Sequence, residues 1–500
     1  MNGPPLAAFE TIIDASGIAR RIEAMLPIGV RARQLSVRTL LLGIMITHDD
    51  QRPAHLTRIH QALTGLPAGE QRRLAVTTDW KNGPHLLTYR QTERTFGLIA
   101  SALGNQDPGG LPSPGLQRAC DDLLEASIPE EIKSLSASLA VDWTDVESFS
   151  RPPPHDAGPG DCADPEASWG HRKDNLTGDQ DELFYGYYLS AAVMVADERG
   201  PRVPELARRM TLSSCRHDPV PALVPVLTAM PAAGIPPGDV LADSGYSHRV
   251  AAHWAAPLRA AGAELVQDLH PHDRGPRGTH AGAIISNGSL YCPQAPRPLL
   301  DLGPLGPAAT REQAAAHDRK TAELARYKLG RLTAEDADGY HRVACPATAG
   351  KVRCPLRPPS MTLDRDRPEV LQPPQHPQAC CTQQTITVPA SVNAKTRQKH
   401  DYPSAAWRRS YARRSAAERA FSTTKDPASN DTARGWCRLM GLAPVMLFTI
   451  TLLAVRNQRI LASWDQRQQE DARRAARGLP PRTRRRRRKA LAALTSASPP

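Results

Sequence analysis

The stretch at residues 411–425, YARRSAAERAFSTTK, restricts the fold of this 500-residue chain more than any other. If it is helical, four polar side chains share one side within an arc of roughly 60°, because each residue advances about 100°. They are Tyr411, Arg414, Glu418 and Lys425. The opposite side carries Ala412, Ala416, Ala417 and Ala420. Small side chains permit close packing, so the pattern predicts a helix that rests on a sheet and carries a charged stripe.

The ends of this helix are also indicated. Ser404 follows Pro403 and is a suitable N-cap, and Pro427 would stop the helix just beyond Lys425. The charged stripe has two interpretations. Arg414 and Glu418 could form an ordinary surface ion pair worth a few tenths of a kcal/mol. Alternatively, the carboxylate and its cations could hold a metal ion next to a polyanion.

The spacing Tyr-x2-Arg-x3-Glu-x6-Lys resembles the YREK signature around the catalytic glutamate of DDE transposases from bacterial insertion sequences. The resemblance implies that Glu418 is a catalytic, metal-binding carboxylate. It also implies that Tyr411, Arg414 and Lys425 contact DNA phosphates. The residue types suit that task, because arginine can bind phosphate through two hydrogen bonds and lysine supplies a mobile point charge.

The partner carboxylates are expected upstream, after strands. Residues 134–146, SLSASLAVDWTDV, indicate a buried strand, and residues 183–196 and 202–213 indicate a strand pair. A helix at 221–230 and a short strand at 239–243, DVLAD, follow. This order is the one that a ribonuclease H-like core requires. The predicted fold class is therefore mixed α/β with such a core.

Open α/β sheets bind ligands at strand ends, so Asp142 and Asp243 are expected side by side, with Glu418 as the third carboxylate. Asp145 competes with Asp142, and Asp243 could instead form an Asx turn. Oxygen ligands without histidine suit Mg²⁺ or Mn²⁺. Two such ions about 3.5 to 4 Å apart can activate a water or a 3′-hydroxyl and stabilise the leaving oxygen.

The rest of the chain divides around this core. Residues 1–130 show helical periodicity at 18–26, 37–46 and 85–103 with interspersed arginines, which predicts a helical region. These arginines could dock a helix in a DNA groove or simply form the solvated side of amphipathic helices, and the resemblance favours binding of DNA ends. The predicted units are 1–130, the first core part at 131–254, an insertion at 255–400, the second core part at 401–465, and a charged helix with a basic tail at 466–500. The five consecutive arginines of that tail are expected to be unstructured and to bind phosphates or aid solubility.

The insertion is proline-rich and contains five of the nine cysteines. They are Cys292, Cys345, Cys354, Cys380 and Cys381. A four-thiolate structural zinc site is one interpretation, but no CxxC pair is present, and this favours free buried thiols. Residues 356–378 indicate an extended connector.

Composition narrows the partners. A net charge of +12 favours a polyanion, and by itself does not choose between DNA, RNA and anionic lipid. An odd number of cysteines and no signal sequence predict a reducing cytoplasm, with association with the bacterial nucleoid implied by the resemblance. The apolar run at 441–455 contains Pro444 and is short for a bilayer, so it predicts a buried helix and no membrane partner.

The sequence therefore predicts a cut-and-paste transposase acting on double-stranded DNA, as a homodimer when assembled on transposon ends. Two alternatives stay open. One is a catalytically inactive DNA-binding descendant of such an enzyme. The other is a ribonuclease H-like nuclease that cleaves without strand transfer.

Overall fold

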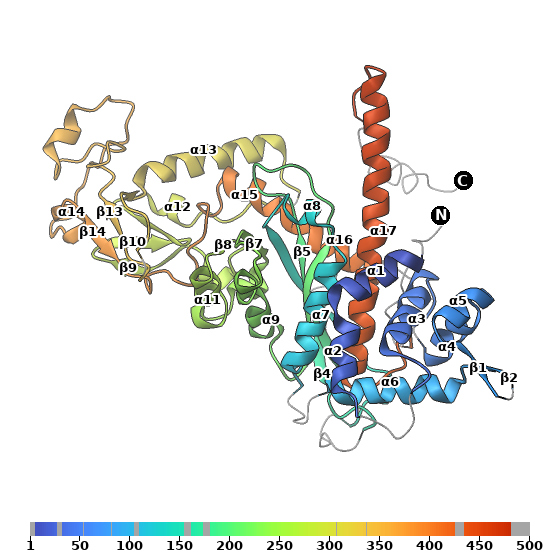
Figure 1. Cartoon of the computed structure of the whole chain (residues 1–500). Coiled ribbons are helices and arrows are strands. Elements are labelled where there is room, and N and C mark those ends of the chain that lie inside the picture. The colour runs from blue at the N-terminus through green and yellow to red at the C-terminus, as the bar shows by residue number, and fades with distance from the viewer. Residues whose placement is uncertain are drawn as a thin grey trace, which may run out of the picture.

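The structure is a computed structural model of a mixed α/β protein (Figure 1). It describes residues 6–27, 33–53, 55–81, 83–104, 110–154, 162–173, 181–306, 308–336, 338–425 and 435–481. In Figure 1 the N-terminal helices and the segment at 268–400 lie on opposite sides of a central sheet. Pro427 and the basic tail at 483–489 lie outside the described residues.

The N-terminal region is helical, as predicted. Its helices are α1 (Leu6–Ser16), α2 (Ile18–Met25), α3 (Val37–Asp49), α4 (Leu56–Thr64), α5 (Ala68–Arg73), α6 (Tyr89–Leu103), α7 (Pro114–Ala126) and α8 (Glu130–Lys133). Ser36 caps α3 by accepting from the Thr39 amide. The expected start of a helix at residue 85 is wrong, because β1 (Thr77–Trp80) and β2 (Gly83–Leu86) form a hairpin there. Thr88 then begins α6 with a capping box.

The central sheet has six strands. They are β3 (Leu139–Glu147), β4 (Ser168–Lys173), β5 (Asp181–Met194), β6 (Ala207–Ser214), β7 (Asp239–Ala242) and β8 (Glu264–Gln267). β3 lies in the middle, antiparallel to β5 and parallel to β7, which is parallel to β8. The other edge of β5 pairs first with β4 and then with β6. This arrangement places the carboxyl ends of β3, β7 and β8 at one edge.

Two sequence-based boundaries need correction. The strand predicted at 134–146 begins only at Leu139, because a helix and a turn precede it, and it continues to Glu147. The insertion was expected from residue 255, but α11 (Ala255–Ala260) packs on the central sheet and β8 belongs to that sheet. The sheet signal of β8 is only four residues long, which is why the pattern did not separate it from its surroundings.

Alternating residues of β3 face two helical layers. Leu139 and Val141 share a core with α9 (Pro219–Thr228) and α11. Ala140 shares the opposite core with α15 (Ala405–Tyr411) and α16 (Ser415–Thr424), including the buried Ala416 and Ala417. The predicted contact between the alanine side of the helix and the sheet is confirmed, except that Ala412 is exposed. This packing fixes the position of α16 above the carboxyl edge.

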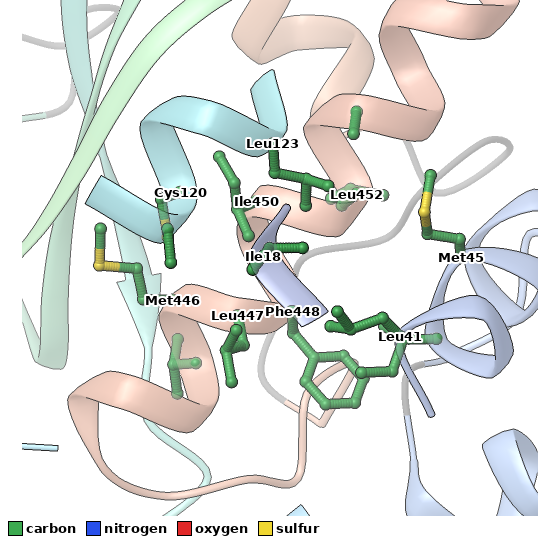
Figure 2. Close-up of a cluster of buried hydrophobic side chains, with 14 of the residues drawn as sticks. Ile18, Leu41, Met45, Cys120, Leu123, Met446, Leu447, Phe448, Ile450 and Leu452 are labelled. Atoms are coloured by element: carbon green, nitrogen blue, oxygen red, sulfur yellow. The ribbon is translucent and has the colours of Figure 1, made fainter. Parts of the chain in front are cut away.

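The long helix α17 (Leu442–Ala476) joins the sheet to the N-terminal region. Figure 2 shows Met446, Leu447, Phe448, Ile450 and Leu452 among side chains of α2, α3 and α7. Two helices were predicted at 441–464 and 466–477, but they form one continuous helix whose charged half projects away from the sheet (Figure 1). Among the described helices, α17 has the length and apolarity to cross a membrane, and most of its apolar stretch is buried inside the protein.

The inserted segment between β8 and α15 contains two three-stranded sheets. Their strands are β9 (Pro276–His280), β10 (Ala283–Ser286), β11 (Ser289–Tyr291), β12 (Gly330–Arg331), β13 (His341–Ala344) and β14 (Ile386–Val388). The helices of the segment are α12 (Arg297–Leu300), α13 (Arg311–Tyr327) and α14 (Ala379–Thr382). Residues 356–378 contain a 3₁₀ turn at Pro358–Thr362 and little regular structure otherwise.

Candidate functional site

Arg414 is the centre of the candidate site at the carboxyl edge of the sheet. Its Nη2 donates to Asp142 Oδ2 at 3.1 Å and to Asp243 Oδ2 at 3.2 Å. Its Nη1 donates to Glu418 Oε1 at 2.6 Å. Three carboxylates that are far apart in sequence therefore meet around one guanidinium. The predicted proximity of Asp142, Asp243 and Glu418 agrees with this arrangement.

The sequence predicted Asp142 at the end of a strand, but in the structure it lies within β3. β3 continues beside β5, whereas its pairing with β7 stops at Ala140. Asp142 therefore borders the place where the neighbouring parallel strand ends. Burial raises its pKa to about 6, with the charges of Asp243 and Glu418 adding to the effect and Arg414 opposing it. This carboxyl group is held in an environment that disfavours its charged form.

Asp243 directly follows β7 and caps the short helix α10 (Ser244–Ser247). Its Oδ1 accepts from the amides of Gly245 at 2.9 Å and Tyr246 at 3.4 Å, which leaves Oδ2 for Arg414. Asp243 therefore forms the Asx-type cap with one carboxylate oxygen and contacts Arg414 with the other. Gly245 is required by sterics, since a Cβ there would lie 2.5 Å from the Trp143 ring.

Glu418 reaches the site from α16, and its side chain is 58% exposed. The predicted single helix is interrupted by a 3₁₀ turn at Ala412–Arg414 between α15 and α16. Ser404 caps α15 as predicted, by accepting from the Trp407 amide. Because a 3₁₀ turn is wound more tightly than an α-helix, the side chains of the signature do not follow one straight stripe.

Tyr411 and Lys425 flank the three carboxylates. The Tyr411 ring stacks on Trp407 with centroids 4.8 Å apart. Burial raises the pKa of Tyr411, and the nearby Asp268, Asp243 and Glu418 act in the same direction. Lys425 ends α16 and donates to Asp145 Oδ1 at 2.7 Å, so it does not contact the three carboxylates that surround Arg414.

Asp145, the competitor of Asp142, has a different environment. It accepts from Arg172 at 2.5 Å as well as from Lys425. Burial acts to raise its pKa, but the hydrogen bonds from these two cations lower it overall. Asp145 is therefore a neutralised ion-pair residue, and Asp142 is the aspartate of β3 that faces Asp243.

The carboxylate cluster carries more negative than positive charge. Burial acts to lower the pKa of Arg414, yet the surrounding Asp142, Asp243 and Glu418 raise it overall, so its positive charge is secure. Hard carboxylate oxygens in excess of their cation suit Mg²⁺ or Mn²⁺. The donor set therefore fits the expected metal, with Asp142, Asp243 and Glu418 as the residues able to hold it.

A second group of metal-binding side chains lies on the same edge. Within the described residues, His248, His270 and Asp273 have ligand atoms that all lie within 4.8 Å of one another, a spacing the three carboxylates around Arg414 do not meet. His270 Nδ1, however, accepts a hydrogen bond from the His272 amide at 3.3 Å, and Asp273 Oδ1 accepts one from Lys395 at 2.8 Å. These existing partners reduce the capacity of the group for a metal.

Sequence reasoning gave no role to Trp143 and Tyr246. The two rings pack with centroids 4.8 Å apart below the turn that carries Asp243, and Tyr246 packs in turn on Trp254. Tyr246 is fully buried, and burial raises its pKa along with the charges of Asp142 and Asp243. The available signal was an aromatic residue close after each aspartate: Trp143 directly follows Asp142, and Tyr246 lies three residues after Asp243.

The expected DNA-binding arginines of the N-terminal region are partly engaged within the protein. Arg38 binds Asp14 and Glu10, and Arg73 binds Glu10 and Glu70. Such pairs leave fewer arginines free for phosphate than the sequence suggests.

Comparisons of the chain with models of protein families, with curated proteins and with solved structures each found no match. The candidate function therefore depends on the geometry of the site and on the signature in the sequence.

Proposed function

We propose that this protein is a DNA transposase with a ribonuclease H-like catalytic core. One observation carries the proposal: Arg414 contacts Asp142, Asp243 and Glu418 at once, although they come from β3, the end of β7 and α16. A surface ion pair between Arg414 and Glu418 would need no buried partners from the sheet. The YREK-type resemblance implies the same three carboxylates as metal ligands and gives Arg414 the role of a phosphate contact.

The strand arrangement supports the same proposal. β3 is followed by the edge strand β4, by β5, which is antiparallel to β3, and by β6, which is antiparallel to β5. β7 and β8 come next and run parallel to β3 on its other side. The helix that carries Glu418 returns to this sheet after the inserted segment. A ribonuclease H-like core requires this order of elements, with the carboxylates at one edge.

The residues would divide the work as follows. Two Mg²⁺ or Mn²⁺ ions held by Asp142, Asp243 and Glu418 would activate the attacking oxygen and stabilise the leaving oxygen of a phosphodiester. Arg414, whose Nε has no hydrogen-bond partner among the described residues, would exchange its carboxylate contacts for a phosphate. Tyr411 and Lys425 would place the transposon end beside it. Hydrolysis would expose a 3′-hydroxyl, which then attacks target DNA.

The net charge of +12 favours a polyanionic partner, and the YREK-type resemblance selects double-stranded DNA among the polyanions. We propose a homodimer assembled on the two transposon ends, working in the bacterial cytoplasm at the nucleoid.

The test uses purified full-length protein and labelled duplexes from the DNA that flanks its coding sequence. We expect Mg²⁺- or Mn²⁺-dependent nicking and covalent joining of labelled ends to a target. Glu418→Gln should reduce both by at least about 10³-fold while DNA binding is largely retained. Glu323→Gln, which changes an exposed glutamate within α13, is the matched control and should keep full activity.

Other outcomes separate the alternatives. Nicking without joining would indicate a nuclease, and binding without nicking under any metal condition would indicate an inactive descendant. Full cleavage by Glu418→Gln would remove this residue from the mechanism.

A further inference from the structure

Two histidines and an aspartate meet where the loop after β7 approaches the loop after β8. His248, His270 and Asp273 each offer one ligand atom, and these three atoms all lie within 4.8 Å of one another. The rings of His248 and His270 have centroids 4.0 Å apart. Ligand atoms around a tetrahedral zinc ion lie about 3.3 Å apart, so small side-chain rotations would bring this group to metal-binding distances.

The backbone holds the three residues in tight turns. His248 ends α10, and its amide donates to the Ser244 carbonyl at 3.0 Å. His270 begins the 3₁₀ turn Pro271–Asp273, whose last amide donates to the His270 carbonyl at 2.8 Å. The His270 amide also donates to Ser247 Oγ at 3.2 Å, which joins the two loops. Two of the side chains thus come from one turn, and the third is tied to that turn through its neighbour.

Two existing contacts compete with a metal for this group, and both can yield. The His272 amide donates to His270 Nδ1 over 3.3 Å, which is long for a hydrogen bond. Lys395 Nζ lies 2.8 Å from Oδ1 and 2.7 Å from Oδ2 of Asp273. The Lys395 side chain is 30% exposed and flexible, so water can take over its ammonium when a divalent ion binds. Competition of this kind lowers the affinity for a metal without removing the site.

The neighbouring arginines do not add to this competition. Arg249 directly follows His248 in the sequence, and Arg274 directly follows Asp273. Each of these arginines binds an aspartate outside the group. Because each guanidinium is held against its own carboxylate, it repels an incoming cation less than an unpaired arginine would.

The ligand types select the metal. Mg²⁺ and Ca²⁺ prefer oxygen ligands, whereas imidazole suits zinc and other transition metals. Two histidines and one carboxylate, with water in the fourth position, are a known coordination of zinc. We propose that His248, His270 and Asp273 bind one Zn²⁺ ion, separately from the carboxylates around Arg414.

The position of this site gives the ion a role. His248 closes the short helix α10, whose N-cap is Asp243. His270 and Asp273 lie between the end of β8 and β9, the first strand of the inserted segment. Zinc would therefore tie the turn that carries Asp243 to the start of the inserted segment. Binding of zinc for this purpose does not depend on the proposed transposase activity.

The test titrates Zn²⁺ into the metal-free full-length protein against a chromophoric zinc chelator, with excess Mg²⁺ to occupy the carboxylates around Arg414. We expect about one Zn²⁺ per chain. His248→Gln, which changes an exposed side chain, and His270→Gln should each weaken zinc binding at least about 10-fold, because loss of even an outer-shell partner has an effect of that size. His253→Gln changes an exposed histidine in the nearby turn Ala251–His253 and is the matched control, so it should bind zinc as the wild type does.

Spectroscopy of the wild type needs no variant to fold. The five cysteines of the inserted segment are free and buried, as expected, so sulfur is the main competing ligand for zinc. X-ray absorption of the zinc-loaded protein should show only nitrogen and oxygen ligands, at about 2.0 to 2.2 Å, together with the outer scattering of imidazole. Sulfur ligands at about 2.3 Å, or no zinc bound in competition with the chelator, would overturn the proposal.

A further variant tests the assignment of Asp273. Lys395→Gln removes the competing ammonium, so zinc binding should become tighter. Unchanged or weaker binding would remove Asp273 from the ligand set. Equal zinc affinities of His248→Gln and His253→Gln would overturn the site itself.

Discussion

The two ends of β7 carry aspartates in contrasting environments. At the start of the strand, Asp239 accepts from Lys399 at 2.6 Å and from Arg413 at 2.7 Å. Just past the end of the strand, Asp243 shares Arg414 with Asp142 and Glu418. Arg413 and Arg414, which are adjacent in one 3₁₀ turn, thus contact the two ends of β7. At the start of β7 two cations surround one carboxylate, whereas beyond its end one cation is shared by three carboxylates.

The difference separates a structural ion pair from a candidate site. Asp239 is only 6% exposed, and its two cations satisfy its charge. The carboxylates around Arg414 stay under-neutralised, which costs stability and is useful only if further cations arrive. Charge balance at each end, rather than the number of charged residues, indicates which end is the candidate site.

The largest expected stability effect is at the balanced end. Asp239→Asn leaves Arg413 and Lys399 without their buried carboxylate, so we expect a loss of about 3 kcal/mol in the free energy of unfolding. Chemical denaturation of the full chain measures it. A loss no greater than that of an exposed substitution such as Glu323→Gln would contradict the structural role of the pair.

Removing a carboxylate should have the opposite effect on stability at the Arg414 end of β7, where Asp142 lies. Because the pKa of Asp142 is raised to about 6 in the folded protein, its charge costs up to about 3 kcal/mol above that pH and nothing below about pH 4, where both states are protonated. Without added metal, Asp142→Asn should therefore increase stability by about 1 to 3 kcal/mol near pH 7.5, and the gain should vanish as the pH falls to about 4.

Asp145→Asn is the matched control on the same strand. Asp142 and Asp145 have equally exposed side chains, at 16%, but the pKa of Asp145 is lowered by Arg172 and Lys425. The charged form of Asp145 stabilises the folded state above its unfolded pKa, and that stabilisation is lost as the pH falls. Its substitution should thus destabilise at neutral pH, and equal effects of the two variants would contradict the comparison.

The smallest expected stability effect is that of Glu418→Gln. Glu418 is mostly exposed, and its i,i+4 pair with Arg414 is worth about 0.5 kcal/mol or less. Thermal unfolding should show almost no shift, which separates any lost cleavage from lost folding. A shift as large as that of Asp239→Asn would instead give Glu418 a structural role.

Local signals in the sequence were sufficient for many elements. The Ser404 cap, the apolar pattern of β3 and the alanines of α16 predicted elements that the structure contains, because capping and periodicity act over a few residues. The predicted bounds of helices and strands were less accurate where an element forms only by pairing with a distant strand. The hairpin at β1 and β2 and the four-residue β8 depend on pairing with other strands, which no short window contains.

For the candidate site, too, local features were predictable from the sequence and long-range contacts were not. The sequence by itself determined the residue types, with Asp142, Asp243 and Glu418 expected together and Arg414 on the same side of the helix. Only the tertiary structure decided that Arg414 joins all three and that Lys425 contacts Asp145 instead. These outcomes depend on long-range strand pairing and on the burial of charge, and both are properties of the assembled sheet and helices rather than of any local pattern.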